Sequence, residues 1–340
     1  PCSRWYKQHR MRISNVALAR ELLEQFPRHS QNAIARMLLK KHPLRFDSMD
    51  NARRAVRHCL PHVKSHSDVK KVSSYAPKPK DIDTPTPPPI PESLSKPWLP
   101  YRLKGKRILI LSDVHMPYHD QAALDAALAH GDTFQPDVVL LNGDIADFYT
   151  ISRYERNPES RPFSDEIKAV RQFLAHLRAR YPDARIVYKM GNHEERWWSF
   201  IWRKAPELLG IDLADFSELV YARQNKIEII GEQRIIQIGL LSVLHGHELP
   251  KGLTNPVNPA RGAFLRTIDI VLSGHHHRTS ENTETSMLDR TITTWSTGCL
   301  CTLHPEYMRI NKHNHGFATV ESDGRDFTVR NMRIRKGRIL

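Results

Sequence analysis

The segment Lys106 to His115, KRILILSDVH, joins a continuous apolar run to an aspartate and a histidine. Two later segments repeat this design: DVVLLNGDIAD at residues 137–147 and ARIVYKMGNHE at residues 184–194. An uninterrupted apolar run of strand length indicates a strand that is buried on both faces of a sheet. Helical patterns near residues 121–130 and 164–180 separate these runs. The sequence therefore predicts alternating strands and helices, an α/β fold.

More strand-like runs follow toward the C-terminus. They are KIEII (226–230), RIIQIGLLSVLHGHE (234–248), DIVLSGHHH (269–277), TITTWSTGCL (291–300), GFATVE (316–321) and FTVRNMRI (327–334). This mixture of strand–helix units and later hairpin-like pieces predicts two packed sheets with helices on the outside. Ligands of such sheets bind just beyond the carboxyl ends of the strands. We therefore expect the functional site at the strand ends.

Ionisable side chains gather at those strand ends. The motifs are Asp113-Val114-His115, Gly143-Asp144-Ile145-Ala146-Asp147, Gly191-Asn192-His193-Glu194, His245-Gly246-His247 and Gly274-His275-His276-His277. Each motif alone is weak, because a single strand-end histidine is often structural. Together they bring carboxylates, imidazoles and an amide to one edge, which core packing does not explain. Two divalent cations about 3.5 to 4 Å apart use such ligands to hydrolyse phosphoesters, and no thiolate is required.

In this order and at these intervals, the motifs resemble those of the calcineurin-like metallophosphoesterase superfamily, from about Arg107 onward. The resemblance implies a four-layer αββα sandwich with two mixed sheets and two divalent metal ions as cofactor. Mn²⁺ is the metal we favour, while Fe, Zn²⁺ and Ni²⁺ also suit the ligand set. The first metal would be bound by Asp113, His115, Asp144 and His277. The second would be bound by Asp144, Asn192, His245 and His275, with Asp144 bridging.

The resemblance also implies the catalytic residues. His193 would donate a proton to the leaving oxygen or stabilise the transition state, and Asp147 would fix the imidazole of His193. Within the histidine run, alternation along an extended chain would direct His275 and His277 to the same side, and Gly274 would allow a sharp turn.

The sequence differs from one subfamily of this superfamily, the protein serine/threonine phosphatases, at two of the motifs. Phe148-Tyr149 follow Asp147 where protein serine/threonine phosphatases have Arg-Gly, and Lys189-Met190 precede Gly191 where those enzymes have an arginine. The segments GDIADFYTISRY, GNHEERWW and GHHHR are more similar to metallophosphoesterases of bacteriophage and prophage genomes. Those proteins also tend to carry a helical N-terminal region and a proline-rich junction. The resemblance does not specify a substrate.

Positive charge is concentrated near the N-terminus. Residues 1–80 hold 18 Lys and Arg against 5 Asp and Glu, whereas the remaining residues hold 33 against 32. A segregated basic module is typical of proteins that bind nucleic acid, because Lys and Arg at phosphates release counterions. A solvated, solubilising surface is the alternative.

The same region predicts three short helices. The first spans Val16 to Phe26, the second is capped by Ser30 and ends near Lys41, and the third runs from about Ser48 to Cys59. They resemble a helix-turn-helix, with the outward-facing Arg53, Arg54 and Arg57 as nucleic-acid contacts. A basic three-helix bundle with another use is the alternative.

The predicted domains are an all-α domain at residues 1–65, a linker at 66–105 and a catalytic domain at 106–340. Nine prolines lie between Pro77 and Pro100 and favour an extended linker. No secretory signal pattern is evident, and the four cysteines are scattered, so we expect a reducing, cytoplasmic setting in a bacterial or phage-infected cell. The apolar runs are too short for a membrane span. Cys299 and Cys301 are interpreted as small buried hydrophobes.

Candidate substrate contacts flank the presumed ligands. Arg196, expected in the first turn of a helix, would bind a substrate phosphate, or else pair with Glu194 or Glu195. His247, like His276, adjoins a presumed ligand and would line the rim. Lys251, in the loop LPKGLTNPVN, would be a further anion contact.

The sequence therefore predicts a dinuclear metal-dependent phosphoester hydrolase. We favour a phosphodiesterase or nuclease that acts on nucleic acid through a metal-activated hydroxide. A phosphomonoesterase or nucleotidase with the N-terminal region as a tether is the first alternative. A DNA-binding protein with an inactive phosphoesterase scaffold is the second, and the intact ligand set argues against it. The oligomeric state stays open.

Overall fold

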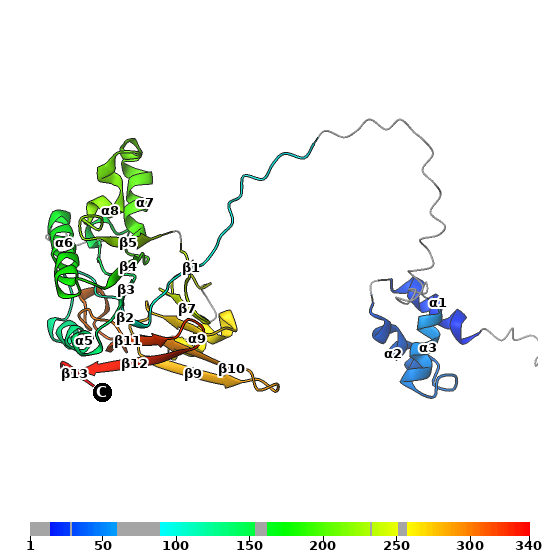
Figure 1. Ribbon diagram of the computed structural model, residues 1–340. Coiled ribbons are helices and arrows are strands. Elements are labelled where there is room, and N and C mark those ends of the chain that lie inside the picture. Colours follow the sequence, from blue (N-terminus) through cyan, green and yellow to red (C-terminus); the bar gives the residue numbers. More distant parts are fainter. Residues whose placement is uncertain (1–13, 28, 60–88, 154–161, 232, 251–256) are drawn as a thin grey trace, which may run out of the picture. The chain divides into compact units, whose positions relative to one another are not determined.

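A computed structural model of the chain describes residues 14–27, 29–59, 89–153, 162–231, 233–250 and 257–340 (Figure 1). The chain divides into two compact units after Glu92. None of the helices within the described ranges is long and apolar enough to cross a membrane.

The N-terminal unit is helical, as predicted. Among its described residues, the helices are α1 (Asn15–Gln25), α2 (Gln31–Lys41) and α3 (Met49–Cys59). The Ser30 hydroxyl caps α2 by accepting a hydrogen bond from the N–H of Ala33 at 3.3 Å, and Ser14 caps α1 in the same way. Leu22, Leu38 and Val56 belong to a common buried core. These contacts confirm the predicted helices and the Ser30 cap.

The strands described in the second unit form two mixed sheets (Figure 1). The first sheet has the order β1 (Tyr101–Arg102), β6 (Ile236–Ile238), β7 (Leu241–Leu244), β8 (Val271–Ser273), β10 (Thr291–Ser296), β9 (Ser280–Thr285). The second has the order β13 (Arg338–Ile339), β12 (Phe327–Arg335), β11 (His315–Ser322), β2 (Arg107–Leu111), β3 (Val138–Asn142), β4 (Arg185–Lys189), β5 (Ile227–Ile230). Strands β2 to β5 are parallel, and β2 pairs with β11 in antiparallel orientation.

Helices cover the outer faces of the two sheets. The second sheet packs against α5 (Gln121–Phe134), α6 (Phe163–Arg180), α7 (Glu195–Lys204) and α8 (Phe216–Leu219). The first sheet packs against α9 (Pro259–Thr267). Short 3₁₀ turns are η1 (Tyr149–Ile151), η2 (Pro206–Leu208), η3 (Asp212–Ala214) and η4 (Glu306–Met308). Between the sheets, Ile110, Leu140 and Leu272 are fully buried in one core. This layering confirms the predicted α/β sandwich.

The first sheet begins within the stretch predicted as linker. Tyr101 and Arg102 form β1 and pair in parallel with Ile236 and Gln237 of β6. The catalytic fold therefore starts ahead of residue 106. Residues 60–88, which include most of the predicted linker, lie outside the described residues.

Candidate metal centre

Loops at the carboxyl ends of neighbouring strands carry the predicted ligands. The loop after β2 holds Asp113 and His115, the loop after β3 holds Asp144 and Asp147, and the loop after β4 holds Asn192 and His193. His245 follows β7, and His275 and His277 follow β8 of the other sheet. Because β2, β3 and β4 are parallel neighbours, and so are β7 and β8, their ends meet at common edges.

One group of donor atoms surrounds His277. Its Nε2 lies 3.2 Å from Oδ1 of Asp113 and 3.3 Å from Nε2 of His115. Nε2 of His115 lies 3.9 Å from Oδ2 of Asp144. The structure thus brings together the four residues that the resemblance assigns to the first metal.

A second group surrounds His245. Its Nε2 lies 3.2 Å from Oδ2 of Asp144 and 3.3 Å from Oδ1 of Asn192. Donor atoms of Asp144, His245 and His275 lie within 4.8 Å of one another. Asp144 therefore belongs to both groups and lies between them.

The outer nitrogens of two of these imidazoles have hydrogen-bond partners. Nδ1 of His115 lies 2.8 Å from Oδ1 of Asp147, and Nδ1 of His245 lies 2.8 Å from the carbonyl oxygen of Asn142. Metal-binding histidines commonly donate their outer N–H to such oxygens, which fixes the tautomer. Both rings therefore direct Nε2 toward Asp144.

The two buried aspartates fit divalent cations. Asp113 and Asp144 are buried, and no Lys or Arg within the described ranges pairs with either carboxylate. Burial opposes ionisation of Asp113, but the charge of His277 keeps its pKa below the usual value. Burial likewise opposes ionisation of Asp144, whose pKa is held well below normal by His193 and His245. Buried carboxylates compensated by imidazoles form a suitable cation site.

The backbone is strained at the same residues. Asp113, His115, Asp144, His275 and His277 all have positive φ angles, between 51° and 67°. Non-glycine residues adopt this region at a cost, and such strain clusters at functional sites.

These angles correct the expected geometry of the histidine run. The chain bends at His275 and His276, and His275 and His277 have positive φ angles, so strand alternation does not explain how the rings of His275 and His277 reach the site. Gly274 does not have a positive φ angle. A glycine is needed at this position because there is no room for a side chain. A Cβ at Gly274 would overlap the hydroxyl of Ser112 and lie 2.7 Å from Oδ2 of Asp113.

Two glutamates that the sequence reasoning did not assign, the buried Glu194 and the partly buried Glu248, hold the ligand loops. Both carboxylate oxygens of Glu194 accept backbone N–H bonds from the Asp144 loop, and one also accepts from Gly191 at 2.7 Å. The Glu248 carboxylate accepts from the N–H groups of His245 (3.1 Å) and Gly246 (2.6 Å), and lies 2.6 Å from Nζ of Lys189. The signal for Glu194 was its place directly after Gly-Asn-His.

His193, Asp147 and Arg196 form one contact group. Nδ1 of His193 lies 2.7 Å from the carbonyl oxygen of Asp147 and 3.3 Å from its Oδ1. Arg196 contacts Nε2 of His193 at 2.8 Å and donates to the same carbonyl at 2.9 Å. Arg196 is thus directed at His193, and neither Glu194 nor Glu195 pairs with it.

A cavity of about 980 Å³ adjoins the second donor group. Its lining includes Asn192, His275, His276, His247, Arg153, Arg196, Arg203 and Arg266. Nε2 of His247 lies 3.2 Å from a carboxylate oxygen of Glu195. Lys251 lies outside the described residues. Of the three predicted substrate contacts, Arg196, His247 and Lys251, the first two therefore line this cavity.

The fold and the site together define a metal-dependent hydrolase, and the comparisons give the family. Residues 106–279 match the model of the calcineurin-like phosphoesterase family. The chain is 33% identical over 184 residues to the Gene 54 protein of Mycobacterium phage D29, covering 51% of this chain and 70% of that protein. It is 31% identical over 183 residues to the Gene 54 protein of Mycobacterium phage L5, with the same coverage.

Solved structures include more distant matches. YfcE, a phosphoesterase from E. coli, shares 13% identity and a TM-score of 0.33, covering 64% of this chain and 89% of that chain. On the strength of the family model and the phage proteins, the chain belongs to the calcineurin-like phosphoesterase family. It is an enzyme that hydrolyses phosphoester bonds with divalent metal ions.

Proposed function

We propose that the chain is a phosphodiesterase or nuclease that cleaves nucleic acid at a dinuclear metal centre. The observation that carries this proposal is the position of Asp144. Its Oδ2 lies 3.2 Å from Nε2 of His245 and 3.9 Å from Nε2 of His115, in two different donor groups. This position supports the proposal that Asp144 bridges two cations.

In this proposal each cation would be held by four residues. Asp113, His115, Asp144 and His277 would hold the first, and Asp144, Asn192, His245 and His275 would hold the second. When bound, such a cation pair stabilises negative charge on the phosphate and lowers the pKa of water to near neutrality. Imidazole, carboxylate and amide ligands suit Mn²⁺, which we propose as the working metal, and also Fe, Zn²⁺ and Ni²⁺.

His193 is the proposed proton donor. Its Nδ1 is held by the carbonyl oxygen of Asp147 at 2.7 Å, so Nε2 is the nitrogen that faces the donor groups. Burial lowers the pKa of His193, but Asp144 and Asp147 outweigh burial and raise it. A protonated His193 can then pass its Nε2 proton to the leaving oxygen.

Arg196 is the proposed phosphate contact. Its guanidinium lies 2.8 Å from Nε2 of His193 and therefore next to the reacting groups. An imidazolium N–H cannot accept a bond from a guanidinium, so protonation of His193 releases this nitrogen of Arg196 toward an incoming phosphate. His247, on the wall of the same cavity, is a proposed substrate contact.

The size of the cavity and the charge of its lining support a diester substrate that carries nucleosides. Its volume of about 980 Å³ far exceeds that of a bare phosphate, and its walls include Arg153, Arg203 and Arg266. Arginine side chains around the second donor group favour a polyanionic substrate.

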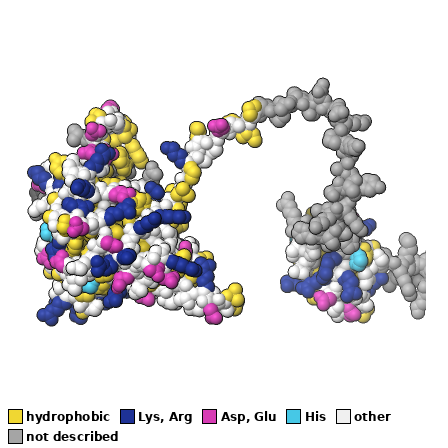
Figure 2. Space-filling model, in the orientation of Figure 1, with side chains coloured by type: hydrophobic (Ala, Val, Ile, Leu, Met, Phe, Trp, Pro, Cys, Tyr) yellow, Lys and Arg dark blue, Asp and Glu magenta, His cyan; other side chains and the backbone are white. Residues whose placement is uncertain are grey.

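We further propose that the N-terminal unit delivers the nucleic acid. On α3, Arg54 and Arg57 are exposed, while Arg53 is held by Asn32 at 3.0 Å and Asp50 at 3.3 Å. Figure 2 shows Lys and Arg side chains on the visible face of this unit. The charge excess of residues 1–80 and the exposed arginines of one helix support nucleic-acid binding. A cytoplasmic enzyme with access to nucleic acid fits this role.

The test is a comparison of substrates with Mn²⁺-loaded protein. We expect turnover of bis(p-nitrophenyl) phosphate to exceed that of p-nitrophenyl phosphate, and cleavage of single- or double-stranded nucleic acid. The Asp144→Asn variant, which is the control, should lose hydrolysis and keep its nucleic-acid affinity. Cleavage of the monoester alone would contradict the proposal and favour a phosphomonoesterase or nucleotidase.

A further inference from the structure

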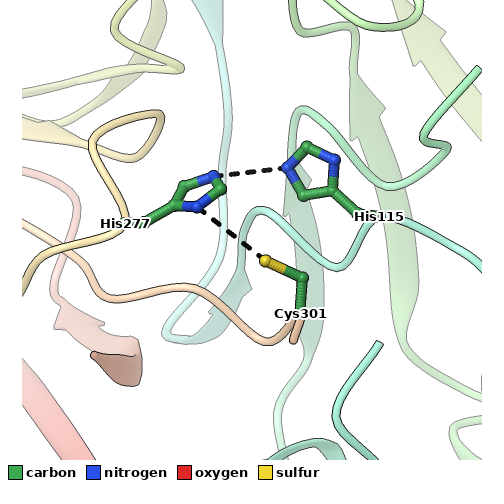
Figure 3. Close-up of side chains that lie close together, drawn as sticks. All are labelled: His115, His277 and Cys301. Carbon is green, nitrogen blue, oxygen red and sulfur yellow. Dashed lines mark hydrogen bonds between the residues drawn. The ribbon is translucent and has the colours of Figure 1, made fainter. Parts of the chain in front are cut away.

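The sulfur of Cys301 contacts the ring of His277 at the nitrogen that does not face Asp113 (Figure 3). Sγ of Cys301 lies 3.8 Å from Nδ1 of His277, whereas Nε2 of the same ring lies 3.2 Å from Oδ1 of Asp113. Figure 3 shows one ring nitrogen directed at His115 and the other at the sulfur. His277 therefore contacts both the donor group and the thiol.

The same arrangement occurs at two other predicted ligands, with different acceptors. Nδ1 of His115 meets a carboxylate oxygen of Asp147, and Nδ1 of His245 meets the carbonyl oxygen of Asn142. At His277 a thiol sulfur occupies the equivalent position. Sulfur is a weaker hydrogen-bond acceptor than oxygen, so the contact at His277 is the weakest of the three.

The backbone fixes the sulfur relative to the donor group. The N–H of Leu300 donates to the carbonyl oxygen of Asp113 at 3.0 Å, and the N–H of Thr302 donates to the carbonyl oxygen of Tyr118 at 2.9 Å. Cys301, between them, is buried, and its own carbonyl oxygen lies 3.0 Å from Nε2 of His315. The segment that carries the thiol is thus attached directly to a predicted ligand.

Cys299 has a different set of partners. Its thiol lies 3.8 Å from the carbonyl oxygen of Asn314 and 3.9 Å from that of Cys301. Cys299 also interacts with the side chains of His277 and Cys301. The sulfur that lies 3.8 Å from Nδ1 of the ring is that of Cys301.

We propose that Cys301 is a positioning residue for His277. Its sulfur accepts the Nδ1–H of His277 and so directs Nε2 toward the cation that Asp113 and His115 hold. This inference rests on the proposed ligand set, and it replaces the interpretation of Cys301 as an inert buried hydrophobe. The sulfur, one nitrogen of His277 and one nitrogen of His115 lie within 4.8 Å of one another. In this proposal the sulfur acts on the ring of His277 and is not itself a ligand, and the spectroscopic test below distinguishes the two roles.

The test is a Mn²⁺ and Co²⁺ titration of the full chain by calorimetry and absorption spectroscopy. The variants are Cys301→Ala, Cys301→Ser, His277→Ala and Leu300→Val. Loss of an outer partner commonly weakens metal binding 10- to 100-fold, and we expect about tenfold at one of two sites for Cys301→Ala. Cys301→Ser keeps a polar acceptor on a shorter bond and should show a smaller loss. Leu300→Val, a buried neighbour that leaves the sulfur in place, is the packing control and should keep the wild-type affinity.

The outcomes separate this inference from the proposed metal site. Equal metal affinity in wild type and Cys301→Ala would overturn the role of Cys301 while leaving the ligand set intact. Unchanged binding in His277→Ala would overturn the ligand set itself. A thiolate-to-cobalt charge-transfer band that disappears in Cys301→Ala would show direct ligation and contradict the positioning role. An equal loss in Leu300→Val would assign the effect to packing and also contradict it.

Discussion

The carboxylate of Glu194 accepts a hydrogen bond from the backbone N–H of Asp144 at 2.9 Å. It also accepts from Ile145, Ala146 and Gly191 and from the hydroxyl of Tyr188, all at 2.7 to 3.0 Å. One buried side chain thus joins the loop after β3 to the loop after β4. This connection holds Asp144 in its left-handed conformation, at φ 53°, between the two donor groups.

Replacing Glu194 should therefore destabilise the fold. In Glu194→Gln an amide NH₂ takes the place of one oxygen and faces backbone N–H donors, which leaves buried donors unpaired. We expect a loss of about 2 to 4 kcal/mol in the free energy of unfolding, measured by urea denaturation. The exposed Glu207→Gln is the matched control and should change stability by less than about 0.5 kcal/mol. Equal effects of the two variants would contradict this role for Glu194.

Metal binding should strengthen as pH rises. Burial lowers the pKa of His245, but Asp144 outweighs it and raises that pKa to about 10. The metal-free imidazole is therefore protonated at neutral pH, and a cation must displace that proton. One displaced proton gives about a tenfold gain in affinity per pH unit between pH 6 and 8. Calorimetry in two buffers of different ionisation enthalpy measures the released proton, and equal affinities at pH 6 and 8 would count against it.

Removing the His193 imidazole should separate catalysis from metal binding. His193→Ala loses the proposed proton donor but none of the proposed ligands. We expect kcat for bis(p-nitrophenyl) phosphate to fall about 10²- to 10⁴-fold with unchanged metal stoichiometry. Asp144→Asn should instead weaken both metal sites. A His193→Ala enzyme with wild-type kcat would rule out the proposed role.

Salt dependence should report the contribution of α3 to nucleic-acid binding. Arg54 and Arg57 are exposed on this helix, and each phosphate contact adds about 0.9 to the slope of log affinity against log salt. The double substitution Arg54→Gln with Arg57→Gln should therefore lower the slope by about 2. Arg20→Gln with Arg36→Gln, on α1 and α2, removes the same charge from exposed positions. If both pairs lower the slope equally, binding is a diffuse charge effect and not a property of α3.

The two sheets and the proximity of the proposed ligands could be predicted from the hydrophobic pattern of the sequence and from the order of the motifs along it. Continuous apolar runs such as residues 108–111 indicate strands that are buried on both faces. In a parallel sheet the carboxyl ends of neighbouring strands lie at the same edge, so the residues that follow them come close together. Strand β9 was missed because its sequence, SENTET, is wholly polar. It lies at the edge of its sheet, where pairing with β10 through Thr283 and Thr293 needs no apolar face.

Local backbone geometry at the site was beyond sequence reasoning. In the run His275 to His277, His275 and His277 take positive φ angles. Histidine adopts such angles more often than most residues, but nothing in the sequence indicates at which histidine this occurs. The contact of Arg196 with His193 was equally hidden, because acidic neighbours at Glu194 and Glu195 offered a simpler partner. The carboxylate of Glu194 instead accepts hydrogen bonds from backbone N–H groups. The contact between Cys301 and His277 depends on long-range structure, because the preceding residue, Leu300, donates a hydrogen bond to Asp113 in the loop after β2.

The most direct test of the central claim is anomalous diffraction from crystals loaded with Mn²⁺. We expect two peaks about 3.5 to 4 Å apart on either side of the Asp144 carboxylate. One should adjoin Asp113 and His277, and the other Asn192 and His245. A single peak, or a second peak away from Asp144, would contradict a dinuclear centre bridged by this residue.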